Sequence, residues 1–221
     1  MLTVHHLNNS RSQRVLWLLE ELGLPYEIRH YQRDAKTMLA PPELKAIHPL
    51  GKSPVITDGP AVLAETGAII ETICEAYGGG RLKPPAGTED RLRWLYWMHY
   101  AEGSAMPPLL LKLVFSALPE RAPGLVKPIV KGISNTALKS FVDPQLAAHF
   151  DYWEAELGKA AWFAGAAFSA ADIMMSFPIE AAAQRGDALK GRPRLAAFLK
   201  TIHARPAYQA ALAKGGPYDY A

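Results

Sequence analysis

The sequence predicts an α/β domain followed by an all-helical domain, and three observations point to this fold class. Strand-like and helix-like patterns alternate in the order β-α-β-α-β-β-α over residues 1–80. A stretch that contains two prolines and a glycine follows at residues 81–90. Beyond it the pattern is helical, with no convincing strand. We therefore expect an α/β domain at 1–80, a linker at 81–90 and a helical domain at 91–221.

The elements of the first domain follow from local pattern. LTVHHL at 2–7 and YEIRHY at 26–31 are rich in strand formers, and 15–22 carries apolar residues at helical spacing. That helix is expected to end at Gly23, with Leu24 folding back onto Leu19 in a Schellman closure.

The rest of the first domain contains a hairpin and two helices. Residues 41–49 predict a short helix or turn between prolines, and 65–77 predict a longer helix that ends in three glycines. Residues 55–57 and 61–64 flank Asp-Gly-Pro, a turn sequence, and so predict a β-hairpin.

The second domain is expected to contain long helices. Residues 91–115 predict one aromatic-rich helix with a kink at Pro107-Pro108. Prolines and glycines are expected to interrupt the chain at 117–135, before a long amphipathic helix at 136–158 and three shorter helices.

Composition and charge argue against several classes of protein function. The chain has 221 residues, is 49% hydrophobic and 20% charged, and carries a dispersed net charge of +3, which argues against nucleic-acid binding. A single cysteine, Cys74, fits a reducing compartment, and no segment is apolar enough to span a membrane, so we expect a cytoplasmic protein. Seven histidines lack ligand-like spacing, and no metal site is expected.

Two predicted helix starts carry capping boxes. Ser169 and Asp172 form one, and the flanking Phe168 and Ile173 can close over it as a hydrophobic staple, which indicates a buried structural cap. Ser10 and Gln13 form the other, where no staple is possible. A polar, open helix start after a strand is a natural place for an anion, so Ser10 is either a plain cap or a functional hydroxyl.

Two further short motifs allow a structural and a functional interpretation. Ser53-Pro54 precedes a strand, where either a trans proline or a cis proline that exposes the Ser53 backbone to an extended ligand would fit. Glu65-Thr66 lies between a strand and a helix, where it is either an N-cap or a carboxylate-binding helix start.

These motifs occur in a specific order along the chain. The N-terminal half contains HHLNNSRSQRVLWLLEELGLPYE, RDA, PPELKAIHPLGKSPVI and LAETGAIIETI, and the C-terminal half contains AEGSAMPPLLLKLVF, WFAGAAFSAADIMMSFP and RPAYQAAL. In this ordered set the chain resembles glutathione S-transferases, within them a bacterial and fungal subgroup. The resemblance runs from about residue 2 to residue 212 and is weakest at 116–145.

The resemblance implies a thioredoxin-like N-terminal domain, an all-helical C-terminal domain, a homodimer, and glutathione as co-substrate in detoxification. It makes Ser10 the hydroxyl that faces the glutathione sulfur, with Asn9 and Ser12 as rivals. The glutathione-binding residues that it implies are Lys52 at the glycyl region, Ser53 and a cis Pro54 at the cysteinyl residue, and Glu65 and Thr66 at the γ-glutamyl end.

A small, hydrophobic electrophile is expected between the domains, near Tyr100 and Met106, whereas Trp94 and Trp97 suit the helical core or a dimer interface. Two other functions stay open. One is glutathione-dependent peroxide reduction, isomerisation or dehalogenation, and the other is a non-enzymatic scaffold of the same fold.

Overall fold

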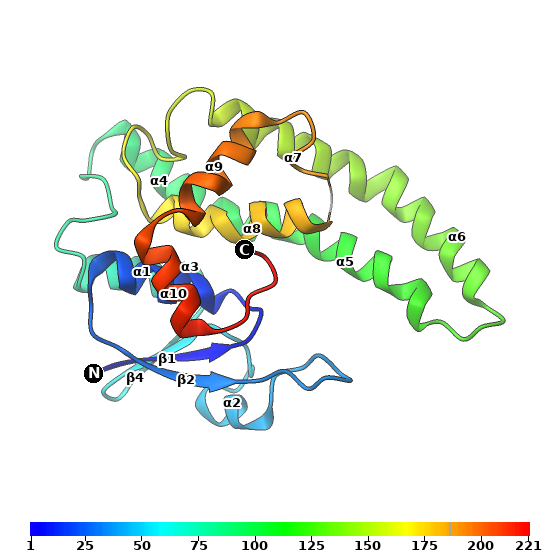
Figure 1. Cartoon of the computed structure of the whole chain (residues 1–221), viewed down its shortest axis with the longest axis horizontal. Helices are drawn as coiled ribbons and strands as arrows, with labels where there is room; N and C mark the ends of the chain where they lie inside the picture. The colour runs from blue at the N-terminus through cyan, green and yellow to red at the C-terminus, as the bar shows by residue number, and fades with distance from the viewer. Residues whose placement is uncertain (186) are drawn as a thin grey trace.

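A computed structural model describes residues 1–185 and 187–221, and it contains a mixed four-stranded sheet beside a helical bundle (Figure 1). The first elements are β1 (Leu2–Leu7), α1 (Ser12–Leu22), β2 (Glu27–Tyr31), α2 (Pro42–Ile47), β3 (Val55–Asp58), β4 (Ala61–Ala64) and α3 (Thr66–Ala76). The remaining elements are α4 (Glu89–Tyr100), the π-helical turn η1 (Ala101–Ala105), α5 (Met106–Arg121), α6 (Lys127–Ala137), the π-helical turn η2 (Leu138–Val142), α7 (Asp143–Glu156), α8 (Ala170–Arg185), α9 (Pro193–His203) and α10 (Pro206–Gly215).

The sheet has the strand order β2-β1-β3-β4. β1 and β2 pair in parallel and are joined through α1, whereas β3 pairs antiparallel with both β1 and β4. This arrangement confirms the predicted β-α-β-α-β-β-α order and the thioredoxin-like N-terminal domain. The division at residues 80 and 91 stays a prediction.

Helix α1 ends as its sequence predicts. Gly23 adopts φ 63°, and its N–H donates to the carbonyl of Glu20, while the N–H of Leu24 donates to the carbonyl of Leu19. These two bonds are the Schellman closure, and glycine is suited to it because it has no Cβ to strain the left-handed conformation.

The first long helix differs from its prediction. The sequence predicted one helix at 91–115 kinked at Pro107-Pro108, but α4 runs into η1 and α5 continues to Arg121. The two prolines lie in the first turn of α5, directly after the π-helical turn. A π-helical turn is wider than an α-helical turn and shifts the register of the backbone hydrogen bonds. The helix therefore continues although the two prolines have no N–H to donate.

The predicted interruption at 117–135 is also wrong in its extent. Only residues 122–126 separate α5 from α6, and Pro128 lies in the first turn of α6, where its N–H is not needed. The helix predicted at 136–158 therefore begins earlier, as α6, and passes through η2 into α7.

The core continues from the sheet side into the bundle. α1 is buried on nearly all sides, because the sheet, α8 and α10 all contact it. Trp94 and Trp97 are buried within this single chain, as is Cys74, whose burial raises the thiol pKa to about 12. None of the helices in the described part of the chain is both long and apolar enough to cross a membrane.

The predicted box at the start of α8 is confirmed. The N–H of Ser169 donates to Asp172 Oδ2 at 2.8 Å, and the N–H of Ala171 donates to Ser169 Oγ at 3.3 Å. Asp172 Oδ1 also accepts from the N–H of Phe163 at 2.9 Å, so this carboxylate anchors the preceding loop. Burial raises the pKa of Asp172 to about 7, although these hydrogen bonds oppose that rise.

Candidate functional site

Three chain segments meet at one edge of the sheet. β1 ends there and leads into α1, and β3 begins there after Pro54, because His5 of β1 pairs with Val55 of β3. β4 ends at the same edge, since Ala64 pairs with Val55. The register therefore places Glu65, which follows Ala64, beside the start of β3.

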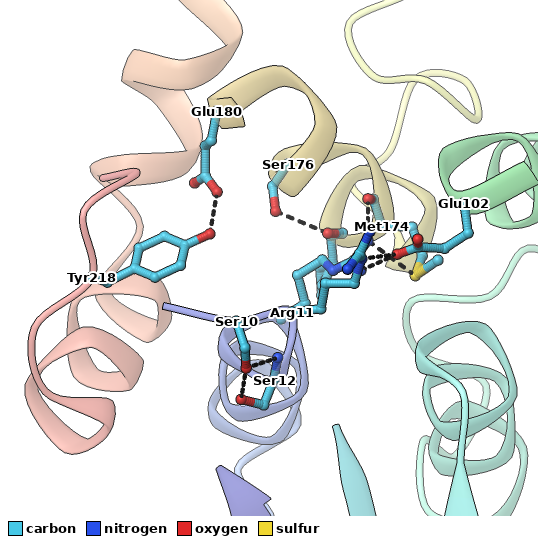
Figure 2. Close-up of polar contacts among 10 residues, drawn as sticks. Ser10, Arg11, Ser12, Glu102, Met174, Ser176, Glu180 and Tyr218 are labelled. Atoms are coloured by element: carbon cyan, nitrogen blue, oxygen red, sulfur yellow. Dashed lines mark hydrogen bonds and ion pairs between the residues drawn. The ribbon is translucent and has the colours of Figure 1, made fainter. Parts of the chain in front are cut away.

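Ser10 lies at this edge, in the turn between β1 and α1. Its Oγ is 2.7 Å from Ser12 Oγ and 3.4 Å from Ser53 Oγ (Figure 2 shows the first pair). The structure thus brings together Ser10 and Ser53, two residues that the sequence assigned to one site from positions 43 apart.

The start of α1 differs from its prediction in two respects. The predicted capping box is wrong, because α1 starts at Ser12 and Gln13 makes no side-chain cap. Ser10 Oγ instead accepts from the N–H of Ser12 at 3.2 Å. The predicted openness is also wrong, since Ser10 is 4% exposed. Its hydroxyl is short enough to turn inward toward Ser12, and that pair fills the space at the end of β1.

A buried histidine extends the chain of hydroxyl groups. His6 Nδ1 lies 2.9 Å from Ser12 Oγ, which in turn contacts Ser10 Oγ. Burial first, and then the nearby His30, lower the pKa of His6 to about 4, although a hydrogen bond with the backbone of Gly215 opposes this. His6 is therefore neutral at pH 7 and can accept a hydrogen bond from Ser12, which leaves Ser12 Oγ to accept one from Ser10.

The peptide bond between Ser53 and Pro54 is cis. Ser53 Oγ donates to the carbonyl of His5 at 3.0 Å and accepts from the N–H of Leu7 at 3.3 Å. These bonds tie the side chain of Ser53 into the end of β1. The serine side chain therefore supports the turn, and a role for Ser53 in binding depends on its backbone.

Glu65 and Thr66 form the start of α3. Glu65 has φ 70°, an uncommon backbone conformation for a residue with a side chain, and such conformations cluster at functional sites. Its side chain is exposed, whereas Thr66 is 3% exposed. No side chain of the described residues caps this helix start, and Lys52 is also exposed.

The sequence analysis missed an ionic cluster on the other side of the α1 start. Arg11 Nε and Arg14 Nη2 both donate to Glu102 Oε1 of η1, the former at 3.0 Å, and Arg14 Nη1 donates to the carbonyl of Met174 in α8 at 2.8 Å (Figure 2). Burial acts to raise the pKa of Glu102, but Arg14 and Arg11 outweigh it, so that this pKa is lowered. Both guanidinium groups also lie over the ring of Phe177, with Cζ of Arg11 at 5.2 Å and Cζ of Arg14 at 5.4 Å from its centroid.

The residues predicted near the electrophile lie deeper in the helical half. Tyr100 is 7% exposed, and its hydroxyl accepts from Trp153 Nε1 at 3.0 Å and contacts His149. Met106 is 6% exposed. Their burial favours a packing role, and their contact with an electrophile stays a prediction.

A cavity of about 730 Å³ lies among α5, α7 and α8, and none of the predicted site residues lines it. Charged side chains surround it, including the ion-paired Lys112 and Asp143. Within residues 1–185 and 187–221, no group of three or more His, Cys, Asp or Glu side chains is arranged to hold a metal ion.

Comparison with known protein families matches two regions of the chain. The model described as glutathione S-transferase, N-terminal domain, matches residues 10–76, and the model of the glutathione S-transferase C-terminal domain matches residues 118–206.

Full-length relatives are similar over nearly the whole chain. Glutathione S-transferase 3 of Schizosaccharomyces pombe is 33% identical over 215 residues, which cover 97% of this chain and 88% of the relative. Glutathione S-transferase 1 of Saccharomyces cerevisiae is also 33% identical, with 97% and 95% of the two chains covered.

Solved structures agree with this similarity. A glutathione S-transferase from Actinobacillus pleuropneumoniae superimposes with a TM-score of 0.81 at 31% identity, covering 100% of this chain and 95% of the other. A sphingomonad glutathione S-transferase complexed with glutathione has the same fold, with a TM-score of 0.73 at 24% identity over 97% and 98% of the two chains.

Proposed function

Because this chain belongs to the glutathione S-transferase family and is an enzyme of that family, we propose that it binds glutathione at the edge of the sheet described above and that Ser10 activates the glutathione thiol. The observation that carries this proposal is the approach of Ser10 Oγ to Ser53 Oγ, 3.4 Å, beside a cis proline. A cysteinyl residue paired with the backbone of Ser53 would bring its sulfur toward Ser10.

The remaining binding groups surround that edge. Glu65 and Thr66 at the start of α3 hold the γ-glutamyl end. Its carboxylate suits the N–H groups of a helix start that no described side chain caps, and its ammonium suits the exposed Glu65 carboxylate. Lys52 offers a cation to the glycyl carboxylate. The complex that the sphingomonad relative forms with glutathione supports the choice of ligand.

The energetics of thiol activation are within reach of these groups. A free thiol has a pKa of about 8.5, and lowering it by about two units requires roughly 2.7 kcal/mol of preference for the thiolate. One hydrogen bond to a charged group contributes about 1.5–3 kcal/mol, and a helix N-terminus about 0.3–1 kcal/mol. Ser10 therefore needs only to donate a hydrogen bond and does not ionise.

In the reaction the thiolate sulfur attacks an electrophilic carbon, a carbon–sulfur bond forms, and in a substitution the leaving group departs with its bonding electrons. We propose a small, hydrophobic electrophile and a role in detoxification. Asn9 and Ser12 are the alternative contacts to the sulfur. Of these two, Asn9 uses its side chain to bind Asp219, and Ser12 uses its hydroxyl in the contact with His6.

We also propose that the protein is a cytoplasmic homodimer. The single cysteine supports a reducing compartment. Three exposed apolar side chains on one face of α4, at spacing i, i+3 and i+4, support self-association, because a continuous apolar stripe is usually covered. They are Leu92 at 70% exposure, Leu95 at 40% and Tyr96 at 47%.

The test compares Ser10→Ala, Asn9→Ala and Ser12→Ala in the conjugation of glutathione to an activated aryl halide. Ser10→Ala is expected to lower kcat/KM roughly ten- to a hundredfold, the equivalent of one hydrogen bond to a thiolate. A larger loss in Asn9→Ala or Ser12→Ala than in Ser10→Ala would move the activating role to that residue.

A further inference from the structure

Residues 216–221 turn back from the end of α10 toward α8 and pass the start of α1 (Figure 1). We call this segment the tail. Two sets of contacts hold it, one to the turn before α1 and one to α8.

The contact with the turn is a closed pair of hydrogen bonds. Asn9 Nδ2 donates to Asp219 Oδ2 at 2.7 Å, and the N–H of Asp219 donates to Asn9 Oδ1 at 2.9 Å. Asn9 has φ 49°, a left-handed conformation that asparagine tolerates better than most residues. This pair therefore fixes the tail at the residue that directly precedes Ser10.

The contact with α8 is made by aromatic residues. The hydroxyl of Tyr218 donates to Glu180 Oε2 at 2.8 Å, and Figure 2 shows this pair. Tyr220 packs against Phe177 with ring centroids 5.2 Å apart and contacts Arg185. The tail therefore joins the sheet half to the helical half at the point where α1 begins.

The tail is held at Asn9, one residue before the hydroxyl that the proposed chemistry needs to reach. Ser10 is 4% exposed, although its hydroxyl must meet a glutathione sulfur. We propose that Asp219 is a positioning residue, which acts through Asn9 to hold the tail over the thiol end of the glutathione site, and that release of this contact admits the sulfur to Ser10. This inference rests on the proposed function.

The contact is suited to reversible release. Pro217, Asp219 and Ala221 are exposed, whereas Tyr218 and Tyr220 pack against α8, so release at Asp219 frees the part of the tail at the turn and leaves the aromatic contacts in place. A protein whose binding-competent form is a minor state binds its ligand more weakly and more slowly, in proportion to the population of that form. Removing one hydrogen bond to a carboxylate is expected to shift the balance toward the open form roughly tenfold.

The experiment measures association and dissociation rates of glutathione by stopped-flow, together with kcat and KM. The variants are Asp219→Ala, Asp219→Asn and a chain that ends after Gly216. Asp219→Ala and the shortened chain are expected to bind glutathione roughly tenfold faster than wild type. Asp219→Asn keeps an oxygen that can accept from Asn9 Nδ2, and its rates are expected to return to near the wild-type values. Glu27→Ala, on the exposed part of β2, is the control for the change in net charge.

Amide hydrogen exchange of residues 9–12 without glutathione gives an independent measurement, and it is expected to accelerate in Asp219→Ala. Wild-type rates of both binding and exchange in Asp219→Ala and in the shortened chain would overturn the role of the tail. If wild type binds no glutathione, the proposed function fails, whereas the exchange rates still decide whether Asp219 holds the tail.

Discussion

Ser10 depends on its neighbours for the direction of its hydroxyl. Ser12 Oγ lies 2.7 Å away and Ser53 Oγ 3.4 Å away, so the proton of Ser10 already has acceptors inside the protein. Donation to a glutathione thiolate replaces one of these bonds by a stronger, charge-assisted one. That exchange is favourable only when the sulfur is charged, and it therefore selects the thiolate over the thiol.

His6 gives a prediction on pH. Its pKa is lowered to about 4 in the folded protein from an unfolded value of 6.5, so between these values the unfolded chain binds more protons than the folded one. The free energy of unfolding is therefore highest above pH 6.5. It falls by up to about 3 kcal/mol through His6 as the pH falls toward 4. Urea unfolding at pH 7 and pH 5 measures it.

His6→Gln is expected to reduce this loss, because the titrating group is gone, and the same substitution at the exposed His99 is the matched control. An unchanged pH dependence in His6→Gln would show that other groups carry the effect.

Only some residues of the site could be predicted from sequence. Three of them lie beside a recognisable local pattern: Ser10 in a turn, Ser53 before a proline and Glu65 at a helix start. Each could therefore be proposed from its neighbours in the chain. The pairing of Arg14 with Glu102 joins residues 88 apart, and nothing local to either residue indicates it. Ser10 is buried where it meets Ser53, 43 positions further along the chain, whereas its sequence neighbourhood indicated an open position.

At the scale of elements, α1 and α10 pack closely at a glycine. A Cβ added to Gly215 would lie 2.6 Å from Gln13 Oε1 and 3.3 Å from His6 Cε1. Gly215→Ala is therefore expected to destabilise the protein by about 1–3 kcal/mol, as other overpacked sites do. Equilibrium unfolding in urea measures the change.

Gly132→Ala in α6 is the matched substitution, because its Cβ would meet no atom of the described residues within 4 Å. It is expected to stabilise the protein by about 0.5–1 kcal/mol, through helix propensity alone. Equal effects of the two substitutions would contradict the close packing of α10 on α1.

The helices show which sequence patterns were sufficient. The end of α1 was predictable because a glycine followed by an apolar residue is a local sequence signature of helix termination. The course of α4 through α7 was not, because proline was taken to interrupt a helix. Pro107 and Pro144 are each the second residue after a π-helical turn, and at both places the helical path continues.

At the scale of the whole molecule, the ionic cluster joins the two halves of the chain. The side chain of Arg14 is 1% exposed, and Glu102 is its carboxylate partner. Glu102→Ala leaves a buried guanidinium group without that partner, and the expected loss is about 3–5 kcal/mol of unfolding free energy.

Glu120→Ala, which removes the exposed partner of Lys127, is the control and is expected to leave stability unchanged. A loss in Glu102→Ala no larger than in this control would mean that the cluster does not hold the two halves together.

The ultraviolet absorbance of the thiolate of bound glutathione, followed against pH, tests the role of Ser10 most directly. In wild type we expect a thiol pKa about two units below the free value of about 8.5. Ser10→Ala is expected to return it toward that value, whereas Ser104→Ala, at an exposed position of η1, is expected to leave it unchanged. Coincident titration curves for wild type and Ser10→Ala, with glutathione bound in both, would contradict the proposal that Ser10 activates the thiol.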